Sequence, residues 1–265
     1  EQYLNSIDGQ EGTALKPLLV EKFVEGSIEL DVDCICDGKD VLIGGIMEHV
    51  EAAGIHSGDS ICCLPAMNIK NAITDKISQY CKKIAVHLNV QGCMNIQFII
   101  KNDEVFVLEI NLRSSRTIPF VNKTTKVPMA RIAALCLCGV SLQEQNIRIT
   151  PHKLNWFSVK HPVFPFSKFS SYQDKFLGPE MKSTGEVMGI DYELHKAYLK
   201  AYIAAGYSIT STNKVLILQC PSDQVLKLVS LINKNFSDIS IVNDIVSQFA
   251  DISGVSWKTI SEGDN

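Results

Sequence analysis

Long apolar runs are missing from this 265-residue sequence. No stretch approaches the roughly 18–20 consecutive apolar residues that cross a bilayer, so we expect no membrane-spanning helix and no membrane partner. The polar, acidic start, EQYLNSIDGQEG, lacks the features of a signal peptide and predicts that the protein is not secreted. The chain also does not begin with Met, which we interpret as the sign of a segment of a longer protein.

An excess of basic residues is missing as well. The 25 Lys and Arg residues and 29 Asp and Glu residues give a net charge of −4. Proteins that bind nucleic acid through bulk charge are basic, so we expect no nucleic-acid partner. The 46% hydrophobic and 20% charged residues are typical of a folded soluble protein, one large domain or two smaller ones.

Cysteine pairs with the C-x2-C spacing of zinc and redox sites are absent, although there are nine cysteines. The cysteines lie in apolar stretches such as ALCLCG and SICCLP. This pattern predicts buried, reduced thiols in a cytoplasmic protein.

The first two hundred residues predict strands and helices in mixed order. Residues 28–36 alternate apolar and polar side chains, which indicates a half-buried strand, and 41–47 follow a turn as its partner. The apolar run 18–24 is long enough for a buried strand, and 54–60 reads as a loop. Residues 151–185, rich in Pro, Phe and Ser, look irregular.

Three helices are expected in the same part of the chain. Apolar residues three or four apart predict a helix over 71–88, with a stripe of Ile73, Ile77, Cys81, Ile84 and Leu88. A second helix opens at Pro128 and stops at Gly139, and a third covers about 193–205.

The composition changes near residues 206–213. NKVLILQC and ISIVN read as strands, and each is followed by a helical pattern, SDQVLKLVSLINKN and NDIVSQFADISG. Alternating strands and helices are typical of a parallel α/β unit. We therefore expect two domains, residues 1–208 and 209–265.

The hairpin over residues 95–111 carries the clearest chemical pattern. With a three-residue loop at 102–104, Lys101 faces Val105, and Gln97 lies directly opposite Glu109 with Asn111 on the same face. The other face then carries an apolar layer of Ile96, Phe98, Ile100, Phe106, Leu108 and Ile110.

Two amide oxygens and a carboxylate on one face are hard ligands that suit Mg²⁺. Arg113 and Arg116 follow at once, and guanidinium groups beside such ligands suit a substrate with phosphate oxygens. The alternative is an ordinary half-exposed hairpin with a polar outer face.

Three segments together resemble carbamoyl phosphate synthetase large chains. They are FIIKNDEVFVLEINLRSSRTIPFV (98–121), IGGIMEHVEAAGIHSGDS (43–60) and LGPEMKSTGEVMG (177–189). The last two resemble the second, carbamate-phosphorylating half of those chains, and residues 213–265 resemble, more weakly, the start of a methylglyoxal synthase-like regulatory domain. Leu112 departs from the family's bacterial members, which usually have proline there.

The resemblance implies an α+β fold, the ATP-grasp fold, of which this chain holds the C-terminal lobe with an antiparallel sheet and helices. It implies Gln97, Glu109 and Asn111 as metal ligands for Mg²⁺ or Mn²⁺, with Glu109 bridging two ions. Together with Glu109, the catalytic residues would be Arg113 and Arg116, which would hold the phosphates and carbamate.

The same resemblance implies the ATP-binding residues. Main-chain groups of Lys22 and Val24 would bind adenine, and Glu29 would bind the ribose. The other residues along the nucleotide would be Gly54, Ile55, His56, Ser57, Gln97 and Glu109. The alternatives are an exposed acid at Glu29, a loop histidine satisfied by a neighbour, and solvated arginines.

The implied activity is the Mg-ATP-dependent phosphorylation of carbamate by the large chain of a glutamine-hydrolysing carbamoyl phosphate synthetase, for pyrimidine or arginine biosynthesis. The implied partners are a glutaminase subunit or fused domain and the rest of the large chain, and residues 1–265 alone are expected to be inactive. Two alternatives stay open: another ATP-grasp carboxylate ligase, such as a biotin carboxylase, and a non-catalytic ATP-grasp binding or regulatory module.

Overall fold

The computed structural model describes residues 22–147, 154–165, 177–208, 214–217, 238–242 and 257–260. The chain divides into two compact units, residues 1–201 and 202–265. The division falls within α5 (Leu194–Ala204), shortly before the boundary that the sequence predicts at 208.

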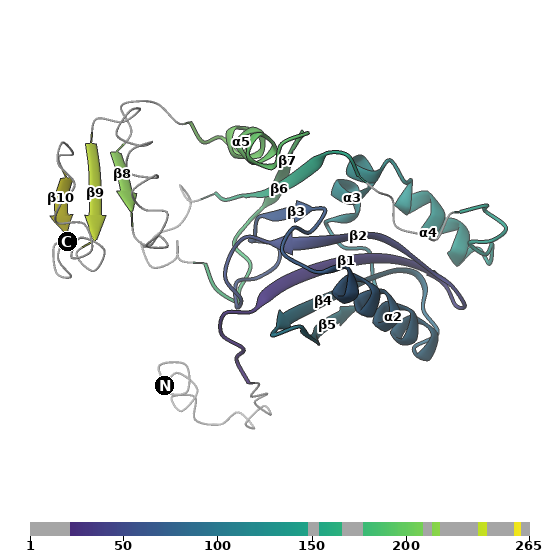
Figure 1. The fold of residues 1–265 in the computed structure, drawn as a ribbon. Coiled ribbons are helices and arrows are strands. Elements are labelled where there is room, and N and C mark those ends of the chain that lie inside the picture. The colour runs from purple at the N-terminus through teal and green to yellow at the C-terminus, as the bar shows by residue number, and fades with distance from the viewer. Residues whose placement is uncertain are drawn as a thin grey trace, which may run out of the picture. The chain divides into compact units, whose positions relative to one another are not determined.

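The first unit is built on a seven-stranded sheet with the order β5-β4-β1-β2-β3-β6-β7 (Figure 1). All six neighbouring pairs are antiparallel, so the predicted α+β class with an antiparallel sheet is confirmed. The strands are β1 (Ile28–Asp37), β2 (Val41–His49), β3 (Cys62–Leu64), β4 (Gln91–Lys101), β5 (Glu104–Asn111), β6 (Phe157–Val163) and β7 (Gly185–Asp191).

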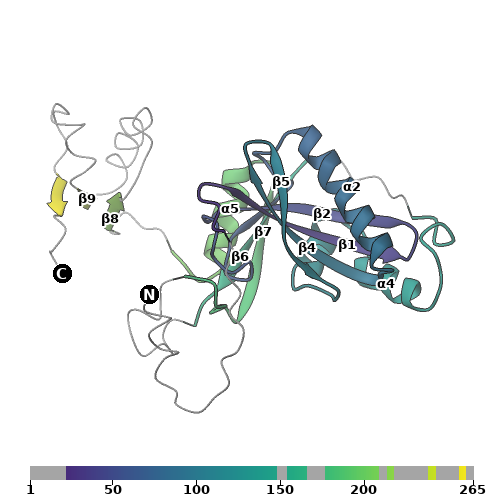
Figure 2. The same ribbon diagram turned by 90° about the horizontal axis from the view of Figure 1, so that it is seen from below.

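Helices cover both faces of this sheet (Figure 1 and Figure 2). α2 (Asn71–His87) packs on one face through Ile73, Ile77 and Cys81 of the predicted stripe, whereas Leu88 follows the helix and is exposed. α3 (Ile118–Thr125) and α4 (Met129–Leu137) pack on the other face. The predicted helices α2, α4 and α5 are thus confirmed, and α3 was missed.

The prediction of a half-buried β1 is wrong. β1 lies in the interior of the sheet between β2 and β4, and the side chains of Asp31 and Asp33 are only 4% and 0% exposed. The alternation of apolar and polar residues is real, but the polar face of the strand is covered. Buried carboxylates need hydrogen-bond partners, so this face must be lined by donors.

The predicted loop of the β4–β5 hairpin is also wrong, although the predicted pair is confirmed. The turn has two residues, Asn102 and Asp103, at φ 51° and 63°, and Lys101 pairs with Glu104. Two left-handed residues make the turn that matches strand twist in two-residue hairpins. A bulge next to Gln97 then shifts the register by one residue and restores Gln97 opposite Glu109.

This change of register corrects the predicted apolar layer. Ile96, Phe98 and Ile100 of β4 are buried, as expected. On β5 the buried residue is Val105, whereas Phe106 and Leu108 are 43% and 47% exposed and Ile110 is exposed as well. A one-residue slip moves side chains to the opposite face, so the loop length decides which residues enter the core.

Two further strand predictions need correction. Residues 22–24 of the apolar run 18–24 form no strand, and residues 18–21 lie outside the described part of the chain. Residues 157–163, predicted as irregular, form β6, which carries Pro162 inside the strand. Proline is unusual within a sheet, which explains why this strand was missed.

The second unit contains β8 (Lys214–Ile217), β9 (Asp238–Val242) and β10 (Trp257–Ile260) in a parallel sheet with β9 in the middle. The sequence predicts β8 and β9 but not β10. The two helices predicted between and after these strands lie outside the described residues. Parallel pairing agrees with the predicted α/β unit, and its methylglyoxal synthase-like identity stays a prediction.

The cysteines of the described part are free thiols, and six of them, Cys34, Cys36, Cys62, Cys63, Cys81 and Cys136, are buried. Burial raises the pKa of Cys36 and of Cys63 to about 12, which keeps these thiols protonated. Cys138 is exposed, contrary to the prediction. Within the described ranges, no helix combines the length and apolar character needed to cross a membrane.

The contact between β7 and α5 gives a test of this packing. A Cβ atom at Gly189 would overlap the Ala197 carbonyl oxygen and the Ala201 amide nitrogen, which are backbone atoms that cannot swing aside. We expect Gly189→Ala to lower the free energy of unfolding by about 1–3 kcal/mol, as overpacking does. Gly185→Ala, on the same strand with open space around it, is the matched control in urea unfolding. Equal stability of the two variants would contradict this packing.

Candidate active site

Two cavities lie side by side on the sheet and share no lining residue. The polar cavity has a volume of about 220 Å3, and the apolar cavity has a volume of about 590 Å3. The polar cavity is lined by Asp31, His56, Ser57, Gly58, Asn95, Gln97, Glu109, Asn111, Arg113, Ser115, Arg116, Thr117, Lys160, Met181 and Glu186. The apolar cavity is lined by Lys22, Phe23, Val24, Ser27, Glu29, Ala53, Gly54, Ile99, Phe106, Val107 and Leu108.

The structure divides the predicted site residues between these two cavities. Those expected to bind adenine and ribose line the apolar cavity: Lys22, Val24, Glu29 and Gly54. Those expected to bind metal, phosphate and carbamate line the polar cavity: His56, Ser57, Gln97, Glu109, Asn111, Arg113 and Arg116. Ile55 lines neither cavity. The roles themselves stay predictions, and the structure shows only that the two predicted groups line separate cavities, one polar and one apolar.

The oxygen ligands predicted for a metal share one face of the β4–β5 pair. Gln97 lies opposite Glu109, and Asn111 lies opposite Asn95. The Gln97 side-chain nitrogen donates to Ser57 Oγ at 3.0 Å, which leaves the amide oxygen available as a ligand. Within the described part of the chain, no hydrogen bond or ion pair engages the Glu109 carboxylate. This donor set fits a hard cation such as Mg²⁺.

Histidine, cysteine or a cluster of acids would indicate a different kind of metal site. Among the described residues, no three His, Cys, Asp or Glu side chains gather in the geometry of such a site. The face of Gln97, Glu109 and Asn111 contains one acid and two amides, which suits a metal that completes its coordination with phosphate oxygens and water.

The loop over residues 51–60 forms one wall of the polar cavity and is held from several sides. The buried Lys160 ammonium donates to the Ser57 carbonyl oxygen at 3.1 Å, and the His56 amide donates to the Gly178 carbonyl at 2.8 Å. His56 Nδ1 accepts from the Gly58 amide at 3.0 Å, so His56 has the neighbour expected in the alternative interpretation. That bond leaves Nε2 of a neutral His56 as a donor.

Glu29 is not the exposed acid of the alternative interpretation, because it is buried. Its carboxylate accepts from the Gly54 amide at 3.1 Å and lies 3.2 Å from His49 Nδ1. Burial lowers the pKa of His49, but Cys62, Asp31 and Glu29 outweigh it and raise the pKa well above its usual range. The contacts with His49 and with the Gly54 amide therefore hold Glu29 in place at the edge of the apolar cavity.

Sequence reasoning missed several charged residues of the polar cavity, above all Asp31, Lys160 and Glu186. Burial lowers the pKa of Lys160, but Cys62, Glu186 and Asp31 outweigh it and raise the pKa. Burial raises the pKa of Glu186 more than Lys160 and Arg116 lower it. The signal for Lys160 was a charged residue in the apolar-rich stretch WFSVKHPV, which the prediction of an irregular segment concealed.

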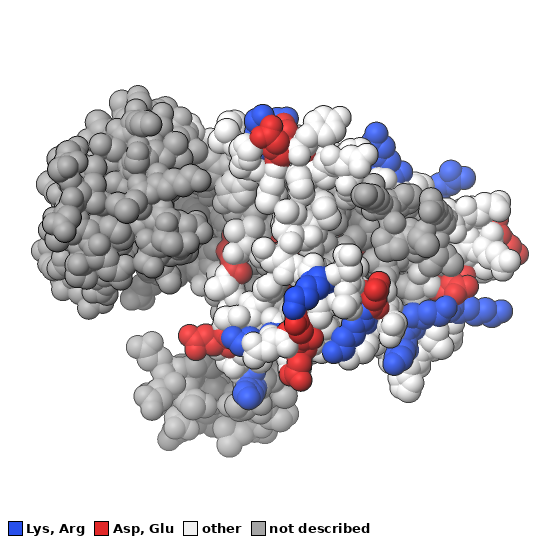
Figure 3. All heavy atoms as spheres, in the orientation of Figure 1, with Lys and Arg blue, Asp and Glu red and all other residues white. Residues whose placement is uncertain are grey.

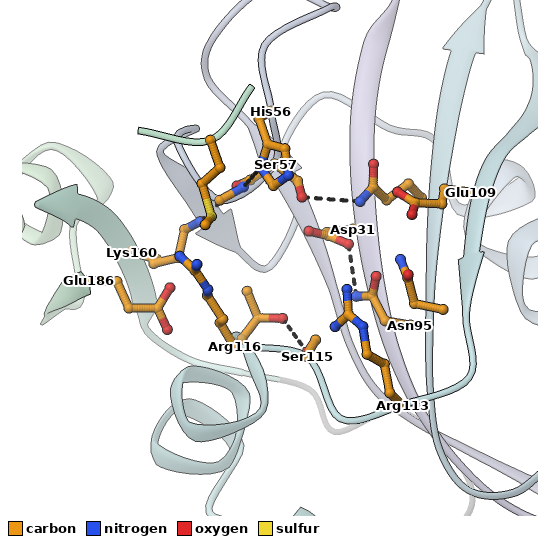
Figure 4. A pocket seen from close by; sticks show the side chains of 15 residues that line it. Asp31, His56, Ser57, Asn95, Glu109, Arg113, Ser115, Arg116, Lys160 and Glu186 are labelled. Carbon is orange, nitrogen blue, oxygen red and sulfur yellow. Dashed lines mark hydrogen bonds between the residues drawn. The ribbon is translucent and has the colours of Figure 1, made fainter. Parts of the chain in front are cut away.

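Arg113 and Arg116 are exposed at this cavity rather than buried in it. Figure 4 shows them between Glu109 on one side and Lys160 and Glu186 on the other. Elsewhere, on the face drawn in Figure 3, Lys and Arg side chains are interspersed with Asp and Glu. The arginines at the cavity thus combine cationic groups with oxygen ligands, an arrangement that suits an anionic, phosphate-containing ligand.

Comparison with known proteins gives many relatives of one kind. The carbamoyl phosphate synthase large chain of Archaeoglobus fulgidus is 48% identical over 219 residues, which are 83% of this chain and 20% of the relative. That of Haemophilus ducreyi is 50% identical over 210 residues, 78% of this chain and 19% of the relative. That of Methanospirillum hungatei is 42% identical over 254 residues, which are 93% of this chain and 24% of the relative. The chain spans about a fifth of the length of these relatives.

Solved structures that match part of this chain include biotin carboxylases. The biotin carboxylase domain of a single-chain bacterial carboxylase has a TM-score of 0.48 and 12% identity, over 54% of this chain and 34% of that one. The biotin carboxylase of Campylobacter jejuni in its β,γ-ATP complex has a TM-score of 0.45 and 17% identity, over 54% of this chain and 31% of that one.

One family matches more than half of the chain. Residues 8–145 match the family described as "Carbamoyl-phosphate synthase L chain, ATP binding domain". This match includes the loop over 51–60, the β4–β5 pair and the two arginines of the polar cavity. The chain therefore belongs to the carbamoyl-phosphate synthase L chain, ATP-binding-domain family.

Proposed function

We propose that this chain is the ATP-grasp catalytic segment that phosphorylates carbamate to carbamoyl phosphate in a glutamine-hydrolysing carbamoyl phosphate synthase. The observation that carries the proposal is the composition of the polar cavity. There the oxygen ligands Gln97, Glu109 and Asn111 share one space with Arg113 and Arg116. The match of the chain to the ATP-binding-domain family supports the same assignment.

In this proposal the nucleotide lies across both cavities. Adenine occupies the apolar cavity beside Phe23 and the main chain of Lys22 and Val24, and the ribose hydroxyls bind Glu29. The phosphates extend along the loop that carries Gly54 and Ser57 into the polar cavity. An apolar cleft with a few fixed polar groups is the usual form of a cofactor site.

Phosphoryl transfer requires alignment and charge neutralisation more than covalent chemistry from the protein. Gln97, Glu109 and Asn111 would hold Mg²⁺ or Mn²⁺, which supplies positive charge to the phosphate oxygens when bound. Arg113 and Arg116 would hold the γ-phosphate and the carbamate in line, so that a carbamate oxygen attacks phosphorus and ADP leaves. The hydrogen bond that Gln97 Nε2 donates to Ser57 Oγ orients the Gln97 amide for this task.

The surroundings of this reaction belong to the same proposal. The partners are the rest of the large chain and a glutaminase subunit or fused domain that supplies ammonia. The location is the cytoplasm, and the product serves pyrimidine or arginine biosynthesis. Residues 209–265 are the start of a methylglyoxal synthase-like regulatory domain.

The metal assignment is tested by Glu109→Gln in the full-length large chain. We expect carbamoyl phosphate formation to fall by about a thousandfold or more, because an amide carries no charge to offset that of a metal ion. The control is Glu104→Gln, an exposed acid at the far end of the same strand, which should keep the wild-type rate. Near-normal turnover of the Glu109 variant would refute the metal assignment, and a product other than carbamoyl phosphate would refute the proposed reaction.

The dependence on the rest of the large chain is tested with residues 1–265 alone. We expect no carbamoyl phosphate from ATP and carbamate, because the relatives are about five times longer and closure around a nucleotide uses parts on both sides of it. Turnover by the isolated chain, measured by product formation, would show that these residues suffice.

A further inference from the structure

The segment over residues 113–117 carries both arginines of the polar cavity, yet it belongs to no helix or strand. β5 ends at Asn111, and α3 begins at Ile118. The hydrogen bond described for the Arg113 side chain runs to the neighbouring Ser114 carbonyl and does not fix the segment to the sheet. Something else must hold these residues, here called the arginine segment, over the cavity.

Asp33 of β1 lies directly under the arginine segment and is fully buried. Ser115 Oγ donates to Asp33 Oδ1 at 2.6 Å, and Thr117 Oγ1 lies 2.6 Å from Asp33 Oδ2. Asn95 Nδ2 donates to Asp33 Oδ1 at 2.9 Å and to Asp31 Oδ1 at 2.8 Å. Within the described ranges, no ion pair includes Asp33.

We propose that Asp33 is a positioning residue, which holds Arg113 and Arg116 over the polar cavity through Ser115 and Thr117. The proposal rests on the proposed function for the task of the arginines, but not for the anchoring itself. The two anchors stand on either side of Arg116 in the sequence. Figure 4 shows the Arg116 side chain extending toward Lys160 and Glu186, away from Ser115.

The hydrogen count of this network indicates how it is held. Asp33, Ser115 and Thr117 make three short oxygen–oxygen contacts, because the two hydroxyl oxygens also lie 2.8 Å apart. Two hydroxyls supply two hydrogens, so a closed ring of three bonds needs a third from a protonated Asp33. An asparagine at position 33 would supply that hydrogen from its amide and keep the ring.

The environment of Asp33 moves the titration of its carboxyl toward neutral pH, so the protonated form persists to higher pH than in an exposed aspartate. Burial, and then the charge of Asp31, raise the pKa of Asp33 to about 6, against the bonds from Ser115, Thr117 and Asn95. The titratable groups that interact with it are Asp31 and Cys34 on β1 and Cys93 on β4, and the arginine segment packed on it carries Arg113 and Arg116.

The anchoring is tested with Thr117→Val in the full-length protein. This variant keeps the shape of the side chain but removes the hydroxyl. We expect kcat for carbamoyl phosphate formation to fall about 10–100-fold, as misplacement by about 1 Å does. The KM for Mg-ATP should change less than kcat, because the residues proposed to bind adenine and ribose line the other cavity and do not depend on Thr117.

Two matched variants separate anchoring from a general effect on folding. Thr117→Ser keeps the hydroxyl and should restore kcat to near the wild-type value. Thr124→Val, in the adjoining helix, removes a buried hydroxyl for which the described residues offer no hydrogen-bond partner, and should leave kcat unchanged. Equal kcat values for Thr117→Val and Thr117→Ser, or a matching loss in Thr124→Val, would overturn the proposal.

Crystal structures of the same variants test the anchoring independently of enzyme activity, because they show the position of the arginine segment directly. We expect residues 113–117 to be displaced in Thr117→Val and to remain in place in Thr117→Ser. If the wild-type protein forms no carbamoyl phosphate, the proposed function fails, and the structures still decide the role of Asp33. An undisplaced segment in Thr117→Val would overturn it.

The protonation of the ring is tested by the stability of Asp33→Asn against pH. A carboxyl with a raised pKa in the folded state stabilises the protein at acid pH and loses this contribution between about pH 4 and pH 6. The wild type should therefore lose stability relative to Asp33→Asn as pH rises. From about pH 5 to about pH 7.5 the ratio of their unfolding constants should change about tenfold in urea titrations. If the stabilities of the wild type and Asp33→Asn change in parallel with pH, Asp33 is not kept protonated in the folded protein.

Discussion

Three carboxylates on one face of the interior strand β1 constrain the rest of the site. Glu29, Asp31 and Asp33 follow one another at every second position, and all three are buried. A buried carboxylate is costly unless donors surround it, so each of these residues draws a different part of the chain to β1. Glu29 takes His49 and the Gly54 amide, Asp31 takes Asn95, and Asp33 takes the arginine segment.

The same face of β1 also explains why the site lies next to the hydrophobic core but does not interrupt it. Two positions after Asp33, Ile35 faces the same way and packs with Met129 and Ile132 around α4. The strand is thus polar at one end and apolar at the other, and the helices cover only the apolar end. The opposite face carries Leu30, Val32 and Cys34 against α2, so the sheet is supported behind the cavities.

The sequence predicts which residues line the site better than it predicts the hydrogen bonds that hold them. Local patterns locate α2, α4 and the facing pair of Gln97 and Glu109, because those features depend on residues close together in the chain. The loop length was wrong and the pair still correct, because the shorter turn and the bulge offset each other. The bond from Ser115 to Asp33 joins residues 82 positions apart, and no periodicity records such a partner. The buried Lys160 was missed for a similar reason. Its place in the site depends on β3 and β7, the strands that pair with its own strand β6.

The two cavities are set apart by the sheet itself. On β1, Glu29 lines the apolar cavity and Asp31 the polar one, and on β4 Ile99 and Gln97 divide in the same way. Residues two positions apart on a strand lie about 7 Å apart, so the spacing between the cavities is fixed by backbone geometry. In the proposed function this spacing separates the adenosine from the phosphates. The arginine segment is not itself part of a strand, so the hydrogen bonds to Asp33 on β1 hold it where a sheet ladder would hold a strand.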